Sequence, residues 1–313
     1  MDTAPPQHRI WTVVLLVSIG WGTGGVMTRA AFEEGLEPFS IVAISSAIAA
    51  IAVVVFATAV RRGFAIGPLG WRVGAVMSLM SVTIPFISRN LALQHASAGF
   101  VGLASALVPL ATAITAHFML SDEPLDSPTI GGLVVALAGV AVLMLSGDAG
   151  IGEGGRPGLA GAFALVGVVS VAVGSVYAKR HAGRYSPLGV AGVQFVLGAM
   201  ITALIMLIAE GVPANPTAAG WGSLVYIGIV ATFMPVALYY WLIRHVTVTY
   251  SAIIGYVIPL IAVVVGVVVL GEEVQPGIVA GGTLILVGVV VTDRARIRRS
   301  AARVEEAVPP ATR

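Results

Sequence analysis

The sequence contains one pattern written twice, 150 positions apart. The pair Gly70-Trp71 recurs as Gly220-Trp221, and Pro109-Leu110 recurs as Pro259-Leu260. Further matches need no gap: Pro85 with Pro235, His95 with His245, Glu123 with Glu273, and Gly131-Gly132 with Gly281-Gly282. Trp, Pro, His and Glu are scarce in apolar sequence and seldom coincide by accident, so the matches predict a duplicated chain. In an apolar chain, such a duplication is typical of membrane proteins built from two related halves.

The composition places the chain in a lipid bilayer. Of its residues 58% are hydrophobic and 10% are charged, whereas a soluble domain has roughly 25% charged residues. The apolar runs are continuous, without the alternation of a β-barrel strand, and a helix needs about 20 residues to cross the hydrocarbon core. The sequence therefore predicts an all-α integral membrane protein with ten transmembrane helices. The predicted spans are 10–29, 39–60, 71–92, 98–120, 128–146, 158–178, 187–209, 221–243, 248–270 and 276–292.

The spans divide into two sets of five. We expect a first repeat at residues 1–146, a linker at 147–157, a second repeat at 158–292, and a charged cytoplasmic tail at 293–313 that frays. If both termini are cytoplasmic, 14 of the 17 Lys and Arg residues lie on the inner side, as the positive-inside rule requires. Because five is odd, the second repeat is then inverted relative to the first.

Several short motifs follow one another in a recognisable order. They are Gly20-Trp21-Gly22, Leu91-Ala92-Leu93, Ser97-Ala98-Gly99, Pro109, Glu123, Gly131-Gly132 and Gly139. Over nearly its whole length the chain resembles the drug/metabolite transporter superfamily, in its ten-span EamA-type branch. The resemblance implies a basket of ten helices around a central cavity, with spans five and ten at the periphery. It also implies export of small metabolites across the bacterial inner membrane, with amino acids, especially aromatic ones as in YddG-like exporters, the first substrates to try.

Four prolines lie near the middle of predicted spans, in matched pairs. Pro85 and Pro235 interrupt spans three and eight, and Pro109 and Pro259 interrupt spans four and nine. Proline removes one helical hydrogen bond and leaves the carbonyl four residues earlier, such as that of Ser105, without its donor. We interpret the four prolines as hinges beside a cavity; the alternative is a static kink that only shapes packing.

The two halves differ in residue type at one pair of positions within the spans. An asymmetric substrate would need such a difference between the halves. Arg89 and Asn90, late in span three, correspond to Tyr239 and Tyr240 in span eight. A guanidinium inside a span suits recognition of a substrate carboxylate, although it could also extend to the headgroups from a helix end. For Arg29 and its counterpart Lys179, both at span ends, we expect contact with headgroups.

Further polar, aromatic and Met residues are candidates for the wall of the cavity. The candidates are Trp21, Met77, Ser81, Ser88, Ser105, Ser175, Tyr177 and Tyr256. Met and aromatic walls with a few hydroxyls suit small amphipathic molecules. Each residue has a structural alternative, because Ser often serves close helix packing and Trp or Tyr often lies at the membrane interface.

Missing motifs narrow the function. The chain has no P-loop, no HExxH or GxSxG motif and no cysteine, so we expect no enzyme, no cofactor and no metal. We also expect no nucleic-acid partner, because topology accounts for the cations, and a monomer is one assembly that these features allow. No Asp or Glu lies in the middle of a span, which favours transport down the substrate's own gradient.

The sequence thus predicts a secondary transporter that exports amino acids or similar small metabolites by alternating access. One alternative is a proton-coupled exporter of quaternary cations and drugs, which generally needs a buried carboxylate. Another is a channel-like pore, because inverted repeats occur there too. In each case the partners are a small-molecule substrate and the lipid bilayer.

Overall fold

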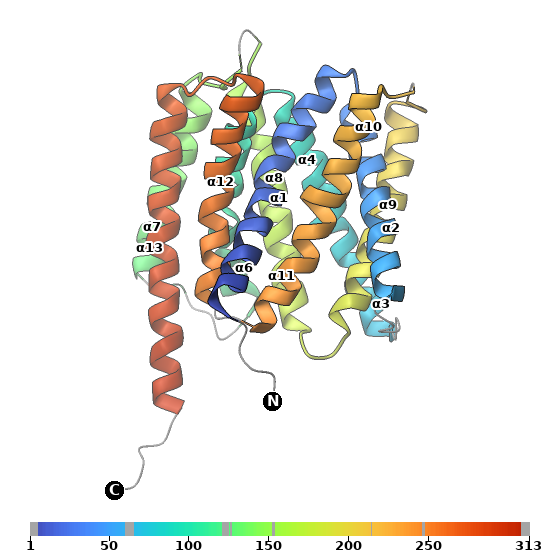
Figure 1. Ribbon diagram of the computed structural model, residues 1–313. Helices are drawn as coiled ribbons and strands as arrows, with labels where there is room; N and C mark the ends of the chain where they lie inside the picture. The colour runs from blue at the N-terminus through green and yellow to red at the C-terminus, as the bar shows by residue number, and fades with distance from the viewer. Residues whose placement is uncertain are drawn as a thin grey trace, which may run out of the picture.

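The computed structural model describes residues 6–59, 66–120, 125, 127–151, 154–213, 215–245 and 248–307. Within these ranges the chain forms helices and no strands (Figure 1). Ten helical segments in the described part of the chain are long and apolar enough to cross a membrane. This arrangement confirms the predicted number of spans, and the predicted boundaries lie within a few residues of the helix ends, except that the last helix continues to Ala307.

Three of the ten spans are built from more than one helical segment. The first half contains α1 (Gln7–Glu33), α2 (Pro38–Ala59), α3 (Pro68–Met77), the π-helix η1 (Ser78–Thr83), α4 (Ile84–Leu93), α5 (Ala98–Ser105), α6 (Val108–Met119) and α7 (Ser127–Leu145). The second half contains α8 (Pro157–Arg180), α9 (Pro187–Ala209), α10 (Ala218–Val225), the π-helix η2 (Tyr226–Phe233), α11 (Met234–His245), α12 (Val248–Leu270) and α13 (Pro276–Ala307).

The two ends of the bundle differ. Helix α1 begins and α13 ends at the lower end in Figure 1, which we call the terminus side; the opposite end is the far side. Helix α13 continues beyond the rest of the bundle to Ala307. The prediction that the chain frays from Asp293 is therefore wrong: this segment is rich in Ala and Arg, which are among the best helix formers.

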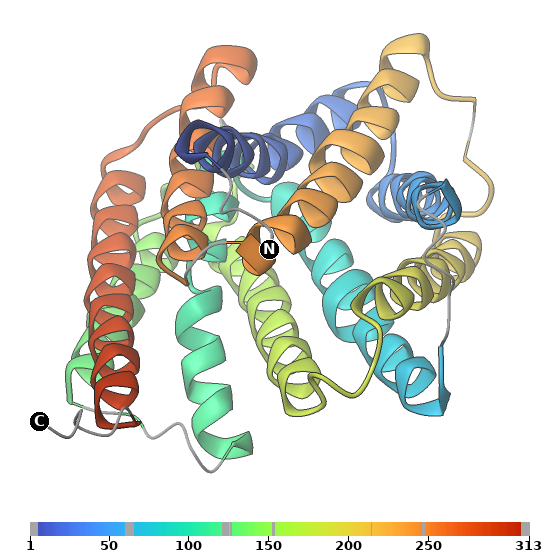
Figure 2. The ribbon, with the colours of Figure 1, turned by 60° about the horizontal axis from the view of Figure 1, so that its bottom comes forward.

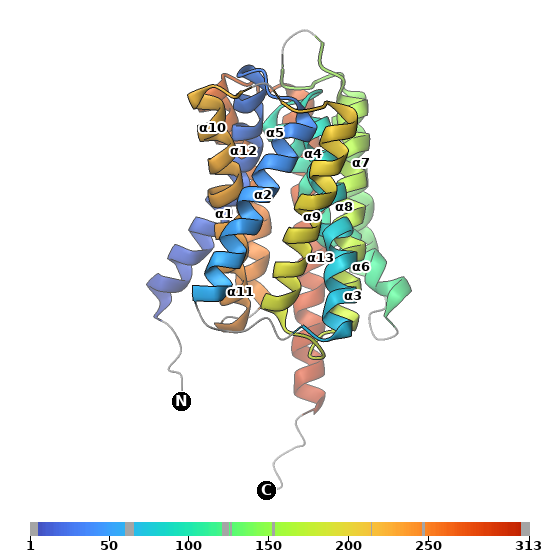
Figure 3. The same cartoon turned by 90° about the vertical axis from the view of Figure 1, so that its right-hand side faces the viewer.

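The two halves pack against each other in matched pairs. Helix α1 lies against α12 and α11, while its counterpart α8 lies against α4, α5 and α6. Helices α2 and α9 lie side by side (Figure 3), and α7 and α13 form a pair at one edge of the bundle (Figure 2). Exchanged contacts of this kind are what a two-fold relation between halves produces. That the halves are inverted across the membrane remains an inference from the five spans in each.

Close contacts between α7 and α13 correct the register of the repeat. A Cβ on Gly132 would lie 2.6 Å from the Gly288 carbonyl oxygen, and one on Gly139 would lie 2.6 Å from that of Gly281. The reverse contacts are 2.8 Å for Gly281 and shorter for Gly288. A two-fold relation exchanges these two pairs if Gly132 corresponds to Gly281 and Gly139 to Gly288. The offset is thus 149 here rather than 150. In this register, Glu123, which lies outside the described residues, corresponds to Glu272.

The midspan prolines have unequal effects on their helices. Pro85 follows the π-helix η1 and Pro235 follows η2, as expected where a carbonyl has lost its donor. Ahead of Pro109 the span breaks, because α5 ends at Ser105 and α6 begins at Val108. Pro259, in contrast, lies inside the continuous helix α12.

Candidate functional site

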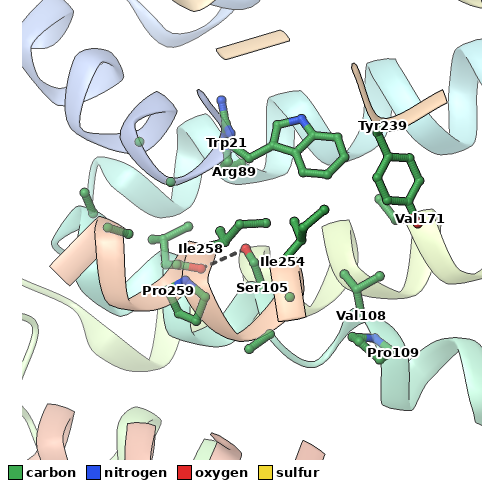
Figure 4. Close-up of a pocket in the computed structure, with 18 of the residues that line it drawn as sticks. Trp21, Arg89, Ser105, Val108, Pro109, Val171, Tyr239, Ile254, Ile258 and Pro259 are labelled. Carbon is green, nitrogen blue, oxygen red and sulfur yellow. Dashed lines mark hydrogen bonds between the residues drawn. The ribbon is translucent and has the colours of Figure 1, made fainter. Parts of the chain in front are cut away.

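A cavity of about 450 Å³ lies at the centre of the bundle (Figure 4). Six spans contribute to its wall, and most of the lining side chains are apolar. The lining residues are Trp21, Gly22, Gly25, Arg89, Ala98, Val101, Gly102, Ser105, Ala106, Val108, Pro109, Val171, Ser175, Tyr239, Ile254, Gly255, Ile258, Pro259 and Ala262. A volume of this size, with a few polar groups among apolar ones, is typical of a small-molecule site.

Arg89 supplies the positive charge of this wall. It is partly buried, it lies behind Trp21 in Figure 4, and its guanidinium nitrogens approach Gly24 of α1. Among the described residues, no carboxylate forms an ion pair with Arg89, and its Nε has no hydrogen-bond partner. A cation without a counter-charge is costly inside a membrane protein. The arrangement is therefore suited to an anionic group brought in by a ligand.

Aromatic rings and hydroxyl groups complete the wall. The rings of Trp21 and Tyr239 lie with centroids 5.5 Å apart and planes inclined by 53°, a geometry that aromatic pairs favour. The Ser105 hydroxyl donates to the Val101 carbonyl at 2.8 Å, and Ser175 lies on the α8 side. The described residues contain no cluster of His, Asp and Glu that could hold a metal ion.

The structure brings five of the twelve predicted substrate contacts into the cavity. These are Trp21, Arg89, Ser105, Ser175 and Tyr239, and the prolines Pro109 and Pro259 also line it. Pro85 and Pro235 do not line it; Pro235 packs beside Gly20 and Pro85 beside Gly167.

The remaining candidates on span three lie away from the cavity. The Ser81 hydroxyl contacts the sulfur of Met77 at 3.6 Å, and both side chains lie beside Gly174 of α8. Ser88 packs against Gly167. The Asn90 amide donates to the Phe86 carbonyl at 2.9 Å, and the amide is buried. None of these four residues lines the cavity.

Two of the predicted tyrosines also lie outside the cavity wall. The Tyr177 ring lies 4.7 Å from the His181 ring, and the Tyr256 hydroxyl donates to Asp293 of α13 at 2.6 Å. Tyr256 therefore joins two helices. The side chain of Tyr240 lies outside the described residues.

Packing around the cavity is tighter on the far side than on the terminus side. Helix α5 packs against α1, α8, α12 and α13, whereas α6 packs chiefly against α8. At the crossing of α5 and α12, Gly102 faces Ala262 and Gly99 faces Val263 so closely that an added Cβ would crowd them. The break between Ser105 and Val108 thus separates a packed far-side half of this span from a loosely packed terminus-side half.

A buried ion pair lies in the far-side packing. The Nε of Arg29 lies 3.5 Å from Oε1 of Glu272, and the two side chains are 21% and 5% exposed. Arg29 also donates to the Leu93 carbonyl at 2.9 Å. The expectation that Arg29 faces headgroups is therefore wrong, because helix ends and a carboxylate surround its guanidinium.

Glu272 binds the amino end of α5 as well. It accepts hydrogen bonds from the Ala98 amide at 2.7 Å and the Gly99 amide at 3.3 Å. Burial raises the pKa of the Glu272 carboxyl above its ordinary value, although the two amides and the charge of Arg29 act in the opposite direction. Sequence reasoning assigned no part to Glu272; the signal available to it was the register of the glycines, which matches Glu272 with Glu123.

Comparison with known proteins agrees with this architecture. The sequence model of the EamA-like transporter family matches residues 9–145 and, a second time, residues 159–292. A solved crystal structure has the same fold, with a TM-score of 0.63 and 22% sequence identity over 91% of this chain and 96% of that one.

Relatives of similar length are described as transporters. An uncharacterized transporter of Archaeoglobus fulgidus is 23% identical and covers 91% of this chain and 99% of its own length. A protein of Streptantibioticus cattleyicolor, named "Probable terminal-alkyne amino-acid exporter", is 26% identical over 97% of this chain and 98% of its own. The uncharacterized inner membrane transporter YedA of Escherichia coli K12 is 28% identical over 58% of this chain and 57% of its own. Ten spans, a central cavity and a match that covers both halves lead to one conclusion: this chain is a multi-pass membrane protein that belongs to the EamA-like transporter family.

Proposed function

We propose that the protein exports small amphipathic molecules that carry a carboxylate, amino acids among them, by alternating access. The observation that carries this proposal is Arg89, a guanidinium that faces the cavity and has no ion-pair partner among the described residues. A guanidinium binds a carboxylate with two parallel hydrogen bonds. The Trp21–Tyr239 pair supplies a flat apolar surface for the side chain of the substrate.

Charge argues against the alternative of a quaternary-cation exporter. Among the lining residues, Arg89 carries the charge, and no Asp or Glu is present. A positively charged wall repels a cationic drug, and a carrier of such drugs needs a carboxylate in the wall of its cavity. The same lack of a carboxylate in the described wall supports export driven by the substrate's own gradient. The packed far side supports a carrier rather than a continuous pore.

The proposed orientation has both termini in the cytoplasm of a bacterial cell. Both ends of the described bundle emerge on one side (Figure 1), and 14 of the 17 Lys and Arg residues belong to that side in the predicted topology. The cavity then faces the cytoplasm through the loosely packed region beside α6, and the far side faces outward.

Uptake into proteoliposomes tests the proposed substrate. The sharpest comparison is phenylalanine against phenylalaninamide, which differ only at the carboxylate, with leucine and tetraethylammonium added and each measured with and without a pH gradient. We expect saturable uptake and counterflow for the two amino acids and little uptake of the amide. Equal transport of acid and amide would remove the role of Arg89. Uptake of tetraethylammonium that depends on the pH gradient would establish the cation exporter, and flux that does not saturate would establish a pore.

A further inference from the structure

Alternating access requires the far side to open at some point in each cycle, and the structure identifies what holds it closed. The amino end of α5 lies at the centre of the far-side packing, and Ser97 caps it by accepting from the Phe100 amide at 3.0 Å. The link between α12 and α13 reaches across to this end and places Glu272 on the amides of Ala98 and Gly99. One carboxylate thus joins span four to the link between spans nine and ten.

The same carboxylate reaches a third element through Arg29. This guanidinium, near the end of α1, pairs with Glu272 and donates to the carbonyls of Leu93 and Ala96 at 2.9 and 3.5 Å. It therefore binds the carboxyl end of α4 while Glu272 binds the amino end of α5. The positive charge of Arg29 thus lies at the carboxyl end of one helix, and the negative charge of Glu272 lies at the amino end of another. Helix dipoles favour both placements.

The surrounding loops hold the link in place. The Gly150 amide donates to the Gln275 side chain at 2.9 Å, the Glu273 amide donates to the Gly150 carbonyl at 3.2 Å, and Asp148 accepts from the Gly277 amide at 2.6 Å. These contacts belong to the loop between the two halves and to the start of α13. They position the link, whereas the contacts of Glu272 reach the helices that line the cavity.

We propose that Arg29, Glu272 and the amino end of α5 form a latch that closes the far side of the transport path. The latch opens when the Glu272 carboxylate leaves the amides of Ala98 and Gly99, so that α5 can separate from α12. The proposal rests on the alternating-access part of the proposed function and is independent of the substrate. Arg29 and Glu272 are positioning residues in this mechanism, because neither lines the cavity.

The chain offers two matched controls. Glu273 is the next residue and is exposed, so Glu273→Gln makes the same chemical change outside the latch. Glu210 binds the start of another helix on the far side: it accepts from the amides of Phe39 and Ser40 at 2.8 and 2.7 Å. Glu210→Gln therefore weakens an equivalent helix cap that joins α9 to α2, away from the cavity.

Site-directed labelling measures the latch directly. Because the protein has no cysteine, Val101→Cys gives a single reporter at a buried position of α5 that lines the cavity. A membrane-impermeant maleimide is applied from the far side in right-side-out vesicles and from the terminus side in inverted ones. With Glu272→Gln, we expect labelling from the far side to rise about tenfold and labelling from the terminus side to fall, since one equilibrium governs both.

The other variants separate a latch from general loosening. Glu273→Gln and Glu210→Gln should label as the parent does, Arg29→Gln should behave like Glu272→Gln, and Glu272→Asp should restore part of the closure. A Glu272→Gln protein that labels like the parent would overturn the proposal. So would faster labelling from both sides at once, or an equal rise with Glu210→Gln, because either result indicates loss of structure. These outcomes are read without substrate, so failure of the amino acid assay leaves them unaffected.

Discussion

Spans four and nine carry a proline at the same repeat position, yet one is broken and the other is continuous. The amides of Ala106 and Leu107 turn back to the carbonyls of Leu103 and Ala104, three residues earlier, just before Pro109. Helix α12 runs through Pro259. Proline permits a break in both spans, and the surroundings decide whether the break occurs.

One side-chain contact distinguishes the two spans near their prolines. Tyr256, three residues before Pro259, is held by Asp293 of α13. The equivalent position in span four is Ala106, which has no side chain that could make such a bond. The second half thus has a fixed helix where the first has a joint, and the joint faces the cavity. The same asymmetry recurs in the wall, where Arg89 belongs to the first half and Tyr239 to the second.

The largest expected effect comes from making the two halves alike at Arg89. Arg89→Tyr copies the residue that the second half has at this position, and it removes a charge-assisted interaction worth about 2–3 kcal/mol. We expect kcat/KM for a carboxylate substrate to fall about 100-fold, with Arg89→Lys in between. Proteoliposome uptake of an amino acid and of its amide measures this effect. An equal loss for both molecules would assign Arg89 to folding.

A smaller effect is expected from the prolines. Pro109→Ala restores the missing helical hydrogen bond and favours a straight span four, so transport should slow by about tenfold if the joint moves during the cycle. Pro259→Ala should change the rate by about twofold or less, because α12 is already continuous. Initial rates at saturating substrate, corrected for the amount of protein inserted, test both. Equal rates for the two variants would abolish the distinction between the spans.

The smallest effect concerns the hydrogen bond that joins span nine to span ten. Tyr256→Phe removes the hydroxyl that donates to Asp293, which should lower the free energy of unfolding by about 1 kcal/mol. Asp293→Asn should cost a similar amount, and the double variant should cost little more, since both changes remove one bond. Thermal unfolding in detergent measures all three. Additive losses would show that the two residues act separately.

The sequence predicted the spans well because they depend on local apolar runs, which fold into helices wherever they lie. It was less successful in predicting which face of each helix lines the cavity. Met77, Ser81 and Ser88 were candidates for the cavity wall, but all three lie against α8, beside Gly174 and Gly167. Which face of a span meets the cavity is decided by the packing of distant helices, so the sequence could not tell that Arg89 faces the cavity while these three residues do not.

Glu272 shows a second reason for failure. Its burial depends on amides more than 170 positions away in the sequence, which no local pattern encodes. The ungapped repeat also directed attention to Glu273, which is exposed. Arg89 and Tyr239 could be found because they occupy matching repeat positions but differ in residue type. A mismatch of this kind is visible in the sequence alone.

The reciprocal glycines of α7 and α13 have a consequence for how such a protein evolves. Each of these close contacts occurs twice: Gly132 meets Gly288, and their copies Gly281 and Gly139 meet in the same way. A bulkier residue at one of these glycines would therefore collide with the backbone of the other helix. The packing of one repeat thus restricts the substitutions that the other repeat can accept. The wall of the cavity has no such mutual restraint across Arg89 and Tyr239. Duplicated genes of this kind can keep their outer frame unchanged while the two copies acquire different chemistry at the centre.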